Sequence, residues 1–205
     1  MPRNAERIGI FGGTFDPVHN GHLVIARAVF EAEHLDRVVF VPSARPPHKG
    51  GDIMFSAADR MKLLDLALHT IPDFEASPIE LNREGPSYTI DTLREMKAAY
   101  PAGTGLFFIV GRDNLFEMES WKDPAGILDA CTVLVADRSC QRGSAPSWIS
   151  GRVRFVPTPV IDISSSMIRK RLRDGLSIRH LVPDTVADEI ERIRMSASDG
   201  MFPNA

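Results

Sequence analysis

The sequence predicts an α/β protein with a doubly wound, mostly parallel sheet. Short apolar runs alternate with segments of helical periodicity along its 205 residues, and this is the pattern of repeated βαβ units. Parallel strands need crossover connections, and these crossovers are right-handed, so helices should cover both faces of the sheet. A ligand is then expected beyond the carboxyl ends of the strands, where the strand order reverses.

Apolar runs bounded by turn residues predict six strands. They cover residues 8–11, 37–41, 74–76, 106–110, 132–136 and 153–156. Residues 38–41 and 106–110 are continuously apolar, which is typical of strands buried on both faces of a parallel sheet. The loops after residues 11 and 110 are therefore expected to lie side by side at one edge of the sheet.

Helical spacing and capping residues predict the helices between these strands. The first begins near His19 or Asn20 and buries a face made of Leu23, Ala26 and Phe30, because these residues are spaced i, i+3 and i+7. Ser56 is expected to cap the second helix and Ser87 the third. Their inward residues are Met61, Leu64 and Leu68 in the second helix, and Ile90, Leu93 and Met96 in the third. The remaining helices are expected after residues 111–114 and at 124–130, 164–173 and 183–195.

The connecting segments fit one domain spanning residues 1–205. Residues 43–55 form a predicted loop, and residues 138–151, rich in Ser, Gly and Arg, form a second one that we expect to be exposed and mobile. Residues 196–205 are expected to fray, as chain ends commonly do.

Composition excludes several classes of protein. The net charge is −3, whereas a surface for a nucleic-acid polymer needs a basic excess. The two cysteines, Cys131 and Cys140, are too few for a disulfide framework. No apolar run approaches the 18 residues of a membrane span, and residues 1–7 carry no signal sequence. These features predict a cytoplasmic protein without membrane association.

The segment from Gly12 to His22 reads Gly-Gly-Thr-Phe-Asp-Pro-Val-His-Asn-Gly-His and predicts a phosphate site. Gly12 and Gly13 follow a strand and bring backbone amides close to a ligand. The helix that follows presents free N–H groups and a partial positive charge at its N-terminus. His19 and His22 lie three residues apart in its first turn, so both imidazoles can reach the same anion. A Gly-Gly pair alone equally fits an ordinary tight turn.

Ile163-Ser164-Ser165-Ser166 places three hydroxyls at the N-terminus of a second helix, with Arg169 about one turn further along. Serine hydroxyls there can cap free amides, and the same groups can hold phosphate oxygens. A third segment, Gly111-Arg112-Asp113, ends a central strand where a carboxylate can accept hydrogen bonds from ribose hydroxyls. Taken alone, the serines fit a simple helix cap and Asp113 fits a capped turn.

The two helix-start segments together resemble the nucleotidyltransferase superfamily. His19 to His22 matches its His-x-Gly-His core, and residues 163–169 resemble its Ile-Ser-Ser-Thr-x-Ile-Arg signature, with Ser166 in place of Thr. The resemblance implies a Rossmann-like nucleotidyltransferase fold in which His19 and His22 are catalytic and contact the phosphates of ATP. It further implies an ATP site that includes Gly12, Gly13, Thr14, Phe15, Gly21, Gly111, Asp113, Arg138, Ile163, Ser164, Ser165, Ser166 and Arg169.

Three more segments indicate the acceptor. Pro46-Pro47-His48-Lys49 lies on a loop, Pro86-Ser87-Tyr88-Thr89 offers amides and a hydroxyl at a helix start, and Trp121 offers a flat ring face. A loop lysine is commonly only solvated, and a tryptophan is more often part of a core. In this order, however, the segments resemble bacterial nicotinate-nucleotide adenylyltransferases over residues 8 to about 173. The resemblance implies acceptor-binding roles for His48, Lys49, Tyr88, Thr89 and Trp121, whereas Lys122 departs from the aromatic residue often found there.

The expected reaction joins ATP and nicotinate mononucleotide into deamido-NAD and pyrophosphate. Mg²⁺ is expected as cofactor, held mainly by ATP phosphates and water, because the sequence shows no cluster of carboxylate ligands. A preference for nicotinamide mononucleotide, or for both acceptors, is the nearest alternative. Phosphopantetheine as acceptor would leave Trp121 and the segment Pro86 to Thr89 unexplained, and the histidine pair and the serine run count against a non-catalytic nucleotide sensor. We expect no nucleic-acid polymer and no membrane as a partner, and a homo-oligomer is possible.

Overall fold

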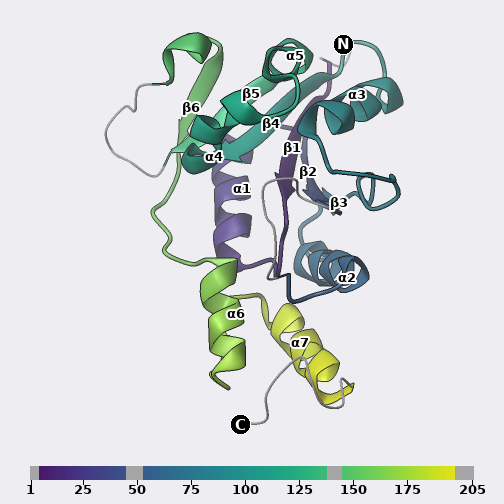
Figure 1. Cartoon of the computed structure of the whole chain (residues 1–205), viewed down its shortest axis with the longest axis vertical. Helices are drawn as coiled ribbons and strands as arrows, with labels where there is room; N and C mark the ends of the chain where they lie inside the picture. Colours follow the sequence, from purple (N-terminus) through teal and green to yellow (C-terminus); the bar gives the residue numbers. More distant parts are fainter. Residues whose placement is uncertain (1–4, 45–52, 138–144, 197–205) are drawn as a thin grey trace.

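The computed structural model describes residues 5–44, 53–137 and 145–196, and within them one six-stranded sheet forms the centre of the molecule (Figure 1). Its strand order is β3-β2-β1-β4-β5-β6, and all five pairings are parallel. The strands are β1 (Arg7–Gly13), β2 (Arg37–Pro42), β3 (Phe74–Ala76), β4 (Gly105–Gly111), β5 (Thr132–Asp137) and β6 (Val153–Pro157). The doubly wound parallel sheet expected from the sequence is confirmed.

Helices cover both faces of this sheet. One face carries α1 (Asn20–Ala32) and α2 (Ala57–Leu68), and α6 (Ser165–Arg173) and α7 (Asp184–Ser196) lie below them in Figure 1, beyond the sheet. The buried residues of these four helices share one apolar cluster. The other face carries α3 (Thr89–Ala99), α4 (Arg112–Glu117) and α5 (Pro124–Ala130), with the short 3₁₀ turns η1 (Met118–Ser120) and η2 (Ser147–Ile149). The chain runs first along β1, β2 and β3 and then returns to the middle at β4.

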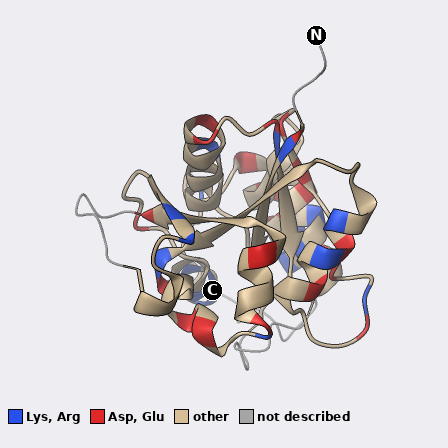
Figure 2. Cartoon of the chain, turned by 90° about the horizontal axis from the view of Figure 1, so that it is seen from above, with Lys and Arg blue, Asp and Glu red and all other residues tan. Residues whose placement is uncertain are grey.

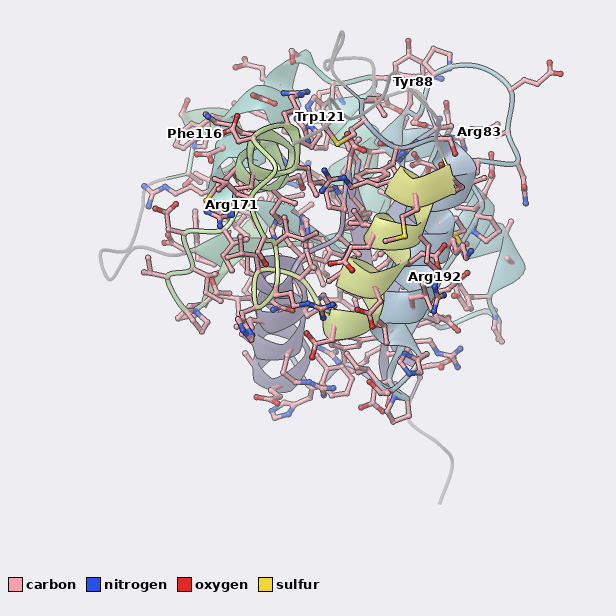
Figure 3. All side chains as sticks on the ribbon, turned by 90° about the horizontal axis from the view of Figure 1, so that it is seen from below. Arg83, Tyr88, Phe116, Trp121, Arg171 and Arg192 are labelled. Atoms are coloured by element: carbon pink, nitrogen blue, oxygen red, sulfur yellow. The ribbon has the colours of Figure 1, made fainter. Side chains whose placement is uncertain are left out.

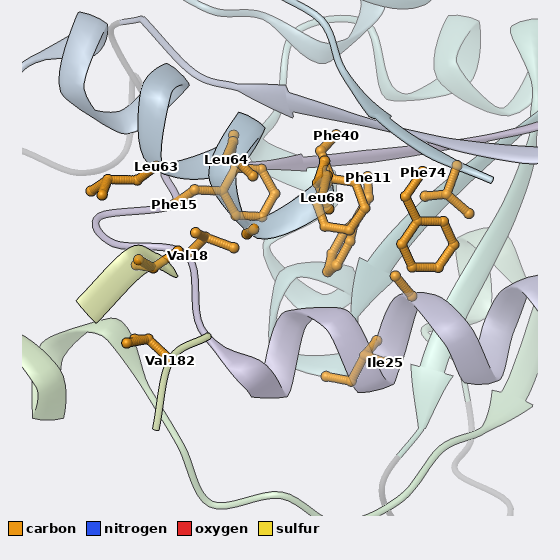
Figure 4. Packing of buried hydrophobic residues seen from close by; sticks show 14 of the residues in the cluster. Phe11, Phe15, Val18, Ile25, Phe40, Leu63, Leu64, Leu68, Phe74 and Val182 are labelled. Atoms are coloured by element: carbon orange, nitrogen blue, oxygen red, sulfur yellow. The ribbon is translucent and has the colours of Figure 1, made fainter. Parts of the chain in front are cut away.

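Alternating strand residues divide the core into these two layers. Phe11 and Phe40 point toward α1 and α2, where they pack with Phe15, whereas Ile10 and Val39 point toward α3 and α5. Figure 4 shows the first layer, with the phenylalanine rings between the sheet and the helices. The central strands β1, β2, β4 and β5 are therefore apolar on both faces, as their apolar runs predict, whereas the edge strands β3 and β6 expose Glu75 and Arg154.

The strand order reverses beside β1, which pairs with β2 on one side and β4 on the other. The segments that leave the carboxyl ends of β1 and β4 therefore start next to each other, at the position where a doubly wound sheet binds ligands.

Acidic and basic residues are interspersed over the ribbon when the molecule is seen from above (Figure 2). No helix among the described residues has the length and apolarity that a bilayer crossing requires.

Three local predictions need correction. Ser87 does not cap α3, which has Tyr88 as its N-cap residue, because the Ser87 hydroxyl accepts from the Ala44 amide at 2.9 Å instead. Met61 is only half-buried, and the inward face of α2 includes Arg60 and Leu63. Part of the segment 138–151 folds, since η2 buries Ile149 completely in the second layer.

Candidate active site

The turn after β1 forms the floor of the site. Gly12 and Gly13 end the strand, and Phe15 then adopts a left-handed backbone conformation with φ of 48°. This conformation is unfavourable for a bulky residue and persists where the surroundings enforce it. The Phe15 ring is 2% exposed and packs edge-on against the His22 ring with centroids 5.0 Å apart. The turn thus orients one of the two motif histidines.

The two histidines stack on each other at the start of α1. Their ring centroids are 3.6 Å apart with an interplanar angle of 24°. His19 is the N-cap residue, and its backbone N–H donates to Nδ1 of His22 at 3.2 Å. An accepting Nδ1 places the proton of a neutral imidazole on Nε2. His22 can therefore donate a hydrogen bond from Nε2 to an anion.

The serine segment meets the histidine segment directly. Ser164 caps α6 by accepting from the Met167 amide at 3.2 Å. The Ser165 hydroxyl donates to the Pro17 carbonyl at 3.0 Å, and Arg169 Nη1 donates to the Asp16 carbonyl at 2.8 Å. Segments about 150 residues apart in the sequence therefore place two helix N-termini side by side.

Two buried charged residues hold the loops around this junction. Asp16 is 2% exposed, and its carboxylate accepts from the amides of Met54 and Phe55 at 2.9 Å each. Arg60 is 1% exposed and donates to the carbonyls of Thr14 and Ser43 at 2.7 and 2.8 Å. Burial lowers the pKa of the Arg60 guanidinium, and the nearby Asp16 charge opposes that shift. These side chains fix the phosphate-site turn against the segments that follow β2 and precede α2.

Two adjoining cavities open at the carboxyl edge of the sheet. We name the first the histidine cavity, because His19 and His22 line it together with Ser164 to Ser166, Arg169 and Asp113. We name the second the aromatic cavity, because Tyr88 and Trp121 line it together with Thr89, Glu80 and Thr92. The residues shared by both linings are Phe11, Gly12, Gly13, Thr14, Gly111 and Asn114. Ligands in the two cavities would therefore meet over the turn after β1.

The aromatic cavity is bounded by α3 and the segment after η1. Trp121 meets Phe108 edge-on with centroids 6.2 Å apart, and its Nε1 has no acceptor within the described part of the chain. Lys122 Nζ lies 4.7 Å from the Tyr88 ring centroid and pairs with Asp91 at 2.8 Å. Figure 3 shows Trp121, Tyr88 and Arg83 toward the same side of the molecule, in the upper part of that view. This arrangement combines ring faces with the N-terminal turn of a helix.

The structure brings most of the residues singled out from the sequence to these two cavities. His19, His22, Thr14 and Asp113 line the histidine cavity, whereas Tyr88, Thr89 and Trp121 line the aromatic cavity. Phe15 also borders the histidine cavity, but its ring belongs to the core, so its backbone is the part that faces a ligand. Gly21 lies in the first turn of α1 against His19. His48, Lys49 and Arg138 lie outside the described residues.

Sequence reasoning missed the buried polar groups that support the site. Asp16 stands inside the recognised motif, yet its role as a carboxylate clamp depends on residues 54 and 55, which are remote in sequence. Arg60 gave one usable signal, because a charged residue falls on the apolar face of α2. Glu80 and Thr92 gave none, since neither stands in a recognised motif.

Known proteins match this chain over most of its length. The family model described as cytidylyltransferase-like matches residues 10–171. A relative from Thermoanaerobacter sp. named probable nicotinate-nucleotide adenylyltransferase is 39% identical, covering 94% of this chain and 95% of the relative. A relative of the same name from Dehalococcoides mccartyi is 36% identical, with 90% and 94% covered.

A solved structure supports the fold. It is the Plasmodium falciparum nicotinic acid mononucleotide adenylyltransferase complexed with NaAD. Its TM-score is 0.75 at 17% identity, with 93% of this chain and 97% of that chain covered.

Proposed function

The chain belongs to the bacterial nicotinate-nucleotide adenylyltransferases, within the cytidylyltransferase-like family, and from that premise we propose how its two cavities share the reaction. The enzyme transfers the adenylyl group of ATP to nicotinate mononucleotide, giving deamido-NAD and pyrophosphate in NAD biosynthesis. In our proposal ATP occupies the histidine cavity and the mononucleotide occupies the aromatic cavity. The observation that carries this assignment is that the two cavities adjoin over Gly12 to Thr14.

Transfer needs no nucleophile from the protein. A phosphate oxygen of the mononucleotide attacks the α-phosphorus of ATP, a new P–O bond forms, and the bond to the β-phosphate oxygen breaks to release pyrophosphate. The protein has to hold two anions that repel each other in line and to stabilise charge on the transferring phosphoryl group. The shared floor of Gly12 and Gly13 is where the reacting phosphates would meet.

His19 and His22 act on the phosphates in this proposal. His22 offers Nε2–H because its Nδ1 accepts from the His19 backbone, and a preorganised donor of this kind stabilises developing charge most effectively in a cavity that excludes water.

The serine segment would hold the β- and γ-phosphates. Ser164 and Ser166 are exposed at the mouth of the histidine cavity, at the N-terminus of α6. Arg169 contributes positive charge there, although its guanidinium also bonds Asp16 and Ser166. Gly111, which ends β4, and Asp113, in the first turn of α4, would contact the ribose of ATP.

The acceptor would use the other cavity. Trp121 would stack on the pyridine ring, and the Thr89 hydroxyl with the first amides of α3 would bind the carboxylate, since the N-cap residue Tyr88 leaves them without a side-chain cap. His48 and Lys49 would reach the phosphate of the mononucleotide. Recognition of a carboxylate by these donors favours nicotinate over the neutral amide.

Mg²⁺ would be held mainly by the ATP phosphates and water. The described residues contain no group of three or more His, Cys, Asp or Glu side chains that could form a complete protein site. This donor set fits a Mg²⁺ ion bound through substrate phosphates, which is common for this ion. When bound, the ion neutralises phosphate charge, and the protein residues position the phosphates around it.

A pyrophosphate-release assay with a panel of acceptors tests the proposal. Nicotinate mononucleotide should give the highest kcat/KM, nicotinamide mononucleotide a lower value, and phosphopantetheine none. Equal or higher kcat/KM for the amide would replace the assignment by a dual-specificity or amide-selective enzyme. ATP binding without pyrophosphate release for any acceptor would identify a nucleotide sensor instead.

A further inference from the structure

A buried carboxylate belongs to the wall of the aromatic cavity and has no part in the roles assigned above. Glu80 is 8% exposed and lines the cavity beside Thr89 and Trp121. Burying a carboxylate is costly, and evolution can retain one where its shape or charge is needed. Desolvation raises the pKa of Glu80, against the lowering effect of its hydrogen bonds from Thr92 and Ser87 and of the Arg83 charge.

The hydrogen-bond directions around Glu80 are determined by its neighbours. Arg83 can only donate, and its Nη2 donates to the Thr92 hydroxyl at 3.2 Å, so the hydroxyl proton of Thr92 is free to point to Glu80 Oε1, 2.6 Å away. The Ser87 hydroxyl likewise accepts from the Ala44 amide at 2.9 Å and donates its own proton to Glu80. Two hydroxyl protons therefore converge on one carboxylate.

These two hydroxyls flank the acceptor segment. Ser87 precedes Tyr88 and Thr89, and Thr92 follows them in the first turn of α3. The Thr92 amide also donates to the Tyr88 carbonyl at 3.3 Å. Holding the residues on both sides fixes the backbone between them, and it joins this segment to Ala44, at the start of the segment that follows β2.

We propose that Glu80 is a positioning residue for the acceptor: by accepting from Ser87 and Thr92 it holds Tyr88 and Thr89 in the conformation that binds the mononucleotide. This inference rests on the proposed function, because it assigns the mononucleotide to the aromatic cavity. Glu80 itself acts through the two hydroxyls and touches neither reacting phosphate. Its loss should therefore weaken acceptor binding while leaving the ATP side intact.

The test replaces Glu80 by leucine, which removes the acceptor oxygens at similar volume, and by glutamine, which keeps one oxygen. Glu80→Leu should raise the Kd of nicotinate mononucleotide, measured by calorimetry, and its KM by about 10-fold, with the KM for ATP changed less than twofold, since loose positioning costs rate or affinity of this order. Glu80→Gln should restore part of the loss. Should Glu80→Leu fail to fold, Thr92→Val removes one of the two hydroxyls at constant shape and should raise the same KM.

Glu189 supplies a matched control. It is 5% exposed, pairs with Lys62 at 2.7 Å and Arg192 at 3.1 Å, and lines neither described cavity. Glu189→Gln should lower stability without changing either KM. A mononucleotide Kd within twofold of the native value in Glu80→Leu would overturn the inference. If the native protein binds the mononucleotide but releases no pyrophosphate, the proposed function is wrong. The mononucleotide Kd of Glu80→Leu, compared with that of the native protein, then still tests the role of Glu80.

Discussion

Replacing Gly21 by alanine should separate the geometry of the histidine pair from the stability of the fold. A Cβ on Gly21 would lie 3.0 Å from Nδ1 and 3.2 Å from Cε1 of His19. Ordinary contacts start near 3.5 Å, so the ring must shift by about 0.5 Å. The ring already stacks on His22 at 3.6 Å between centroids, and a shift of one ring therefore displaces the other or breaks the stack.

The expected cost is in turnover. Because misplacing a catalytic group by about 1 Å can lower the rate about 100-fold, a displacement half as large should lower kcat about 10-fold. Alanine is a better helix former than glycine by up to about 1 kcal/mol, which offsets part of the steric cost. We therefore expect the melting temperature of Gly21→Ala to stay within about 4 °C of the native value.

Pyrophosphate release at saturating ATP and nicotinate mononucleotide measures kcat, and a thermal melt measures stability. Ala28→Gly in the same helix is the control, since Ala28 lines neither described cavity. It should lower the melting temperature and leave kcat unchanged. A kcat for Gly21→Ala within twofold of the native enzyme would refute the claim that the position of the His19 ring limits the reaction.

Four further outcomes follow from the same structure. His22→Ala should lower kcat about 100- to 1,000-fold, the usual effect of removing a donor to developing charge, with an unchanged circular dichroism spectrum; turnover near the native rate would remove His22 from the mechanism. Asp16→Ala leaves two buried amides unpaired and should lower the free energy of unfolding in urea by about 3 kcal/mol; a loss below about 1 kcal/mol would show that the clamp is dispensable. Burial raises the pKa of the Cys131 thiol to about 12. In Cys140→Ser, Cys131 is the one remaining cysteine. A disulfide reagent at pH 8 should react with this variant over 100-fold more slowly than with a free thiol. The raised pKa of Glu80 means that the folded state binds the Glu80 proton more tightly than the unfolded state. The contribution of Glu80 to the free energy of unfolding should therefore fall as pH rises through the range just above the ordinary glutamate pKa. Urea titrations over about pH 4 to 7 should show that the free energy of unfolding falls less with pH in Glu80→Gln than in the native protein.

The strands and the two helix starts were within reach of the sequence because they depend on local signals. Continuous apolar runs mark strands buried on both faces, and the position of His19 and Asn20 after Pro17 marks the start of α1. The rule for ligand sites in doubly wound sheets then brings the loops after β1 and β4 together. The family resemblance assigned the serine segment to the same site as these loops. Neither motif indicated that this segment contacts Asp16 and Pro17.

Ser87 illustrates what local signals cannot decide. A serine ahead of an apolar helical pattern is a good cap by composition. In the folded chain its hydroxyl bonds Ala44, 43 residues earlier, and Glu80, and α3 starts after Tyr88. The Ser87 hydroxyl thus bonds tertiary partners instead of the amides of α3. The sequence pattern alone cannot indicate which of these partners lies within hydrogen-bond distance.

The buried charges around the cavities are best understood as constraints on shape. Arg60 is desolvated, which lowers its pKa, and Glu80 is desolvated, which raises its pKa, so each charge is held at a cost to the folded state. An apolar residue of equal volume commonly restores stability at such a position, but it cannot bond the carbonyls of Thr14 and Ser43 or the hydroxyls of Ser87 and Thr92. Both sets of partners belong to segments that line the cavities, where the chain leaves the sheet and regular backbone pairing ends. Hydrogen bonds from buried side chains therefore fix the backbone of these loops, as backbone pairing in the sheet fixes the strands. The loops fixed in this way line the cavities in which two negatively charged substrates would bind.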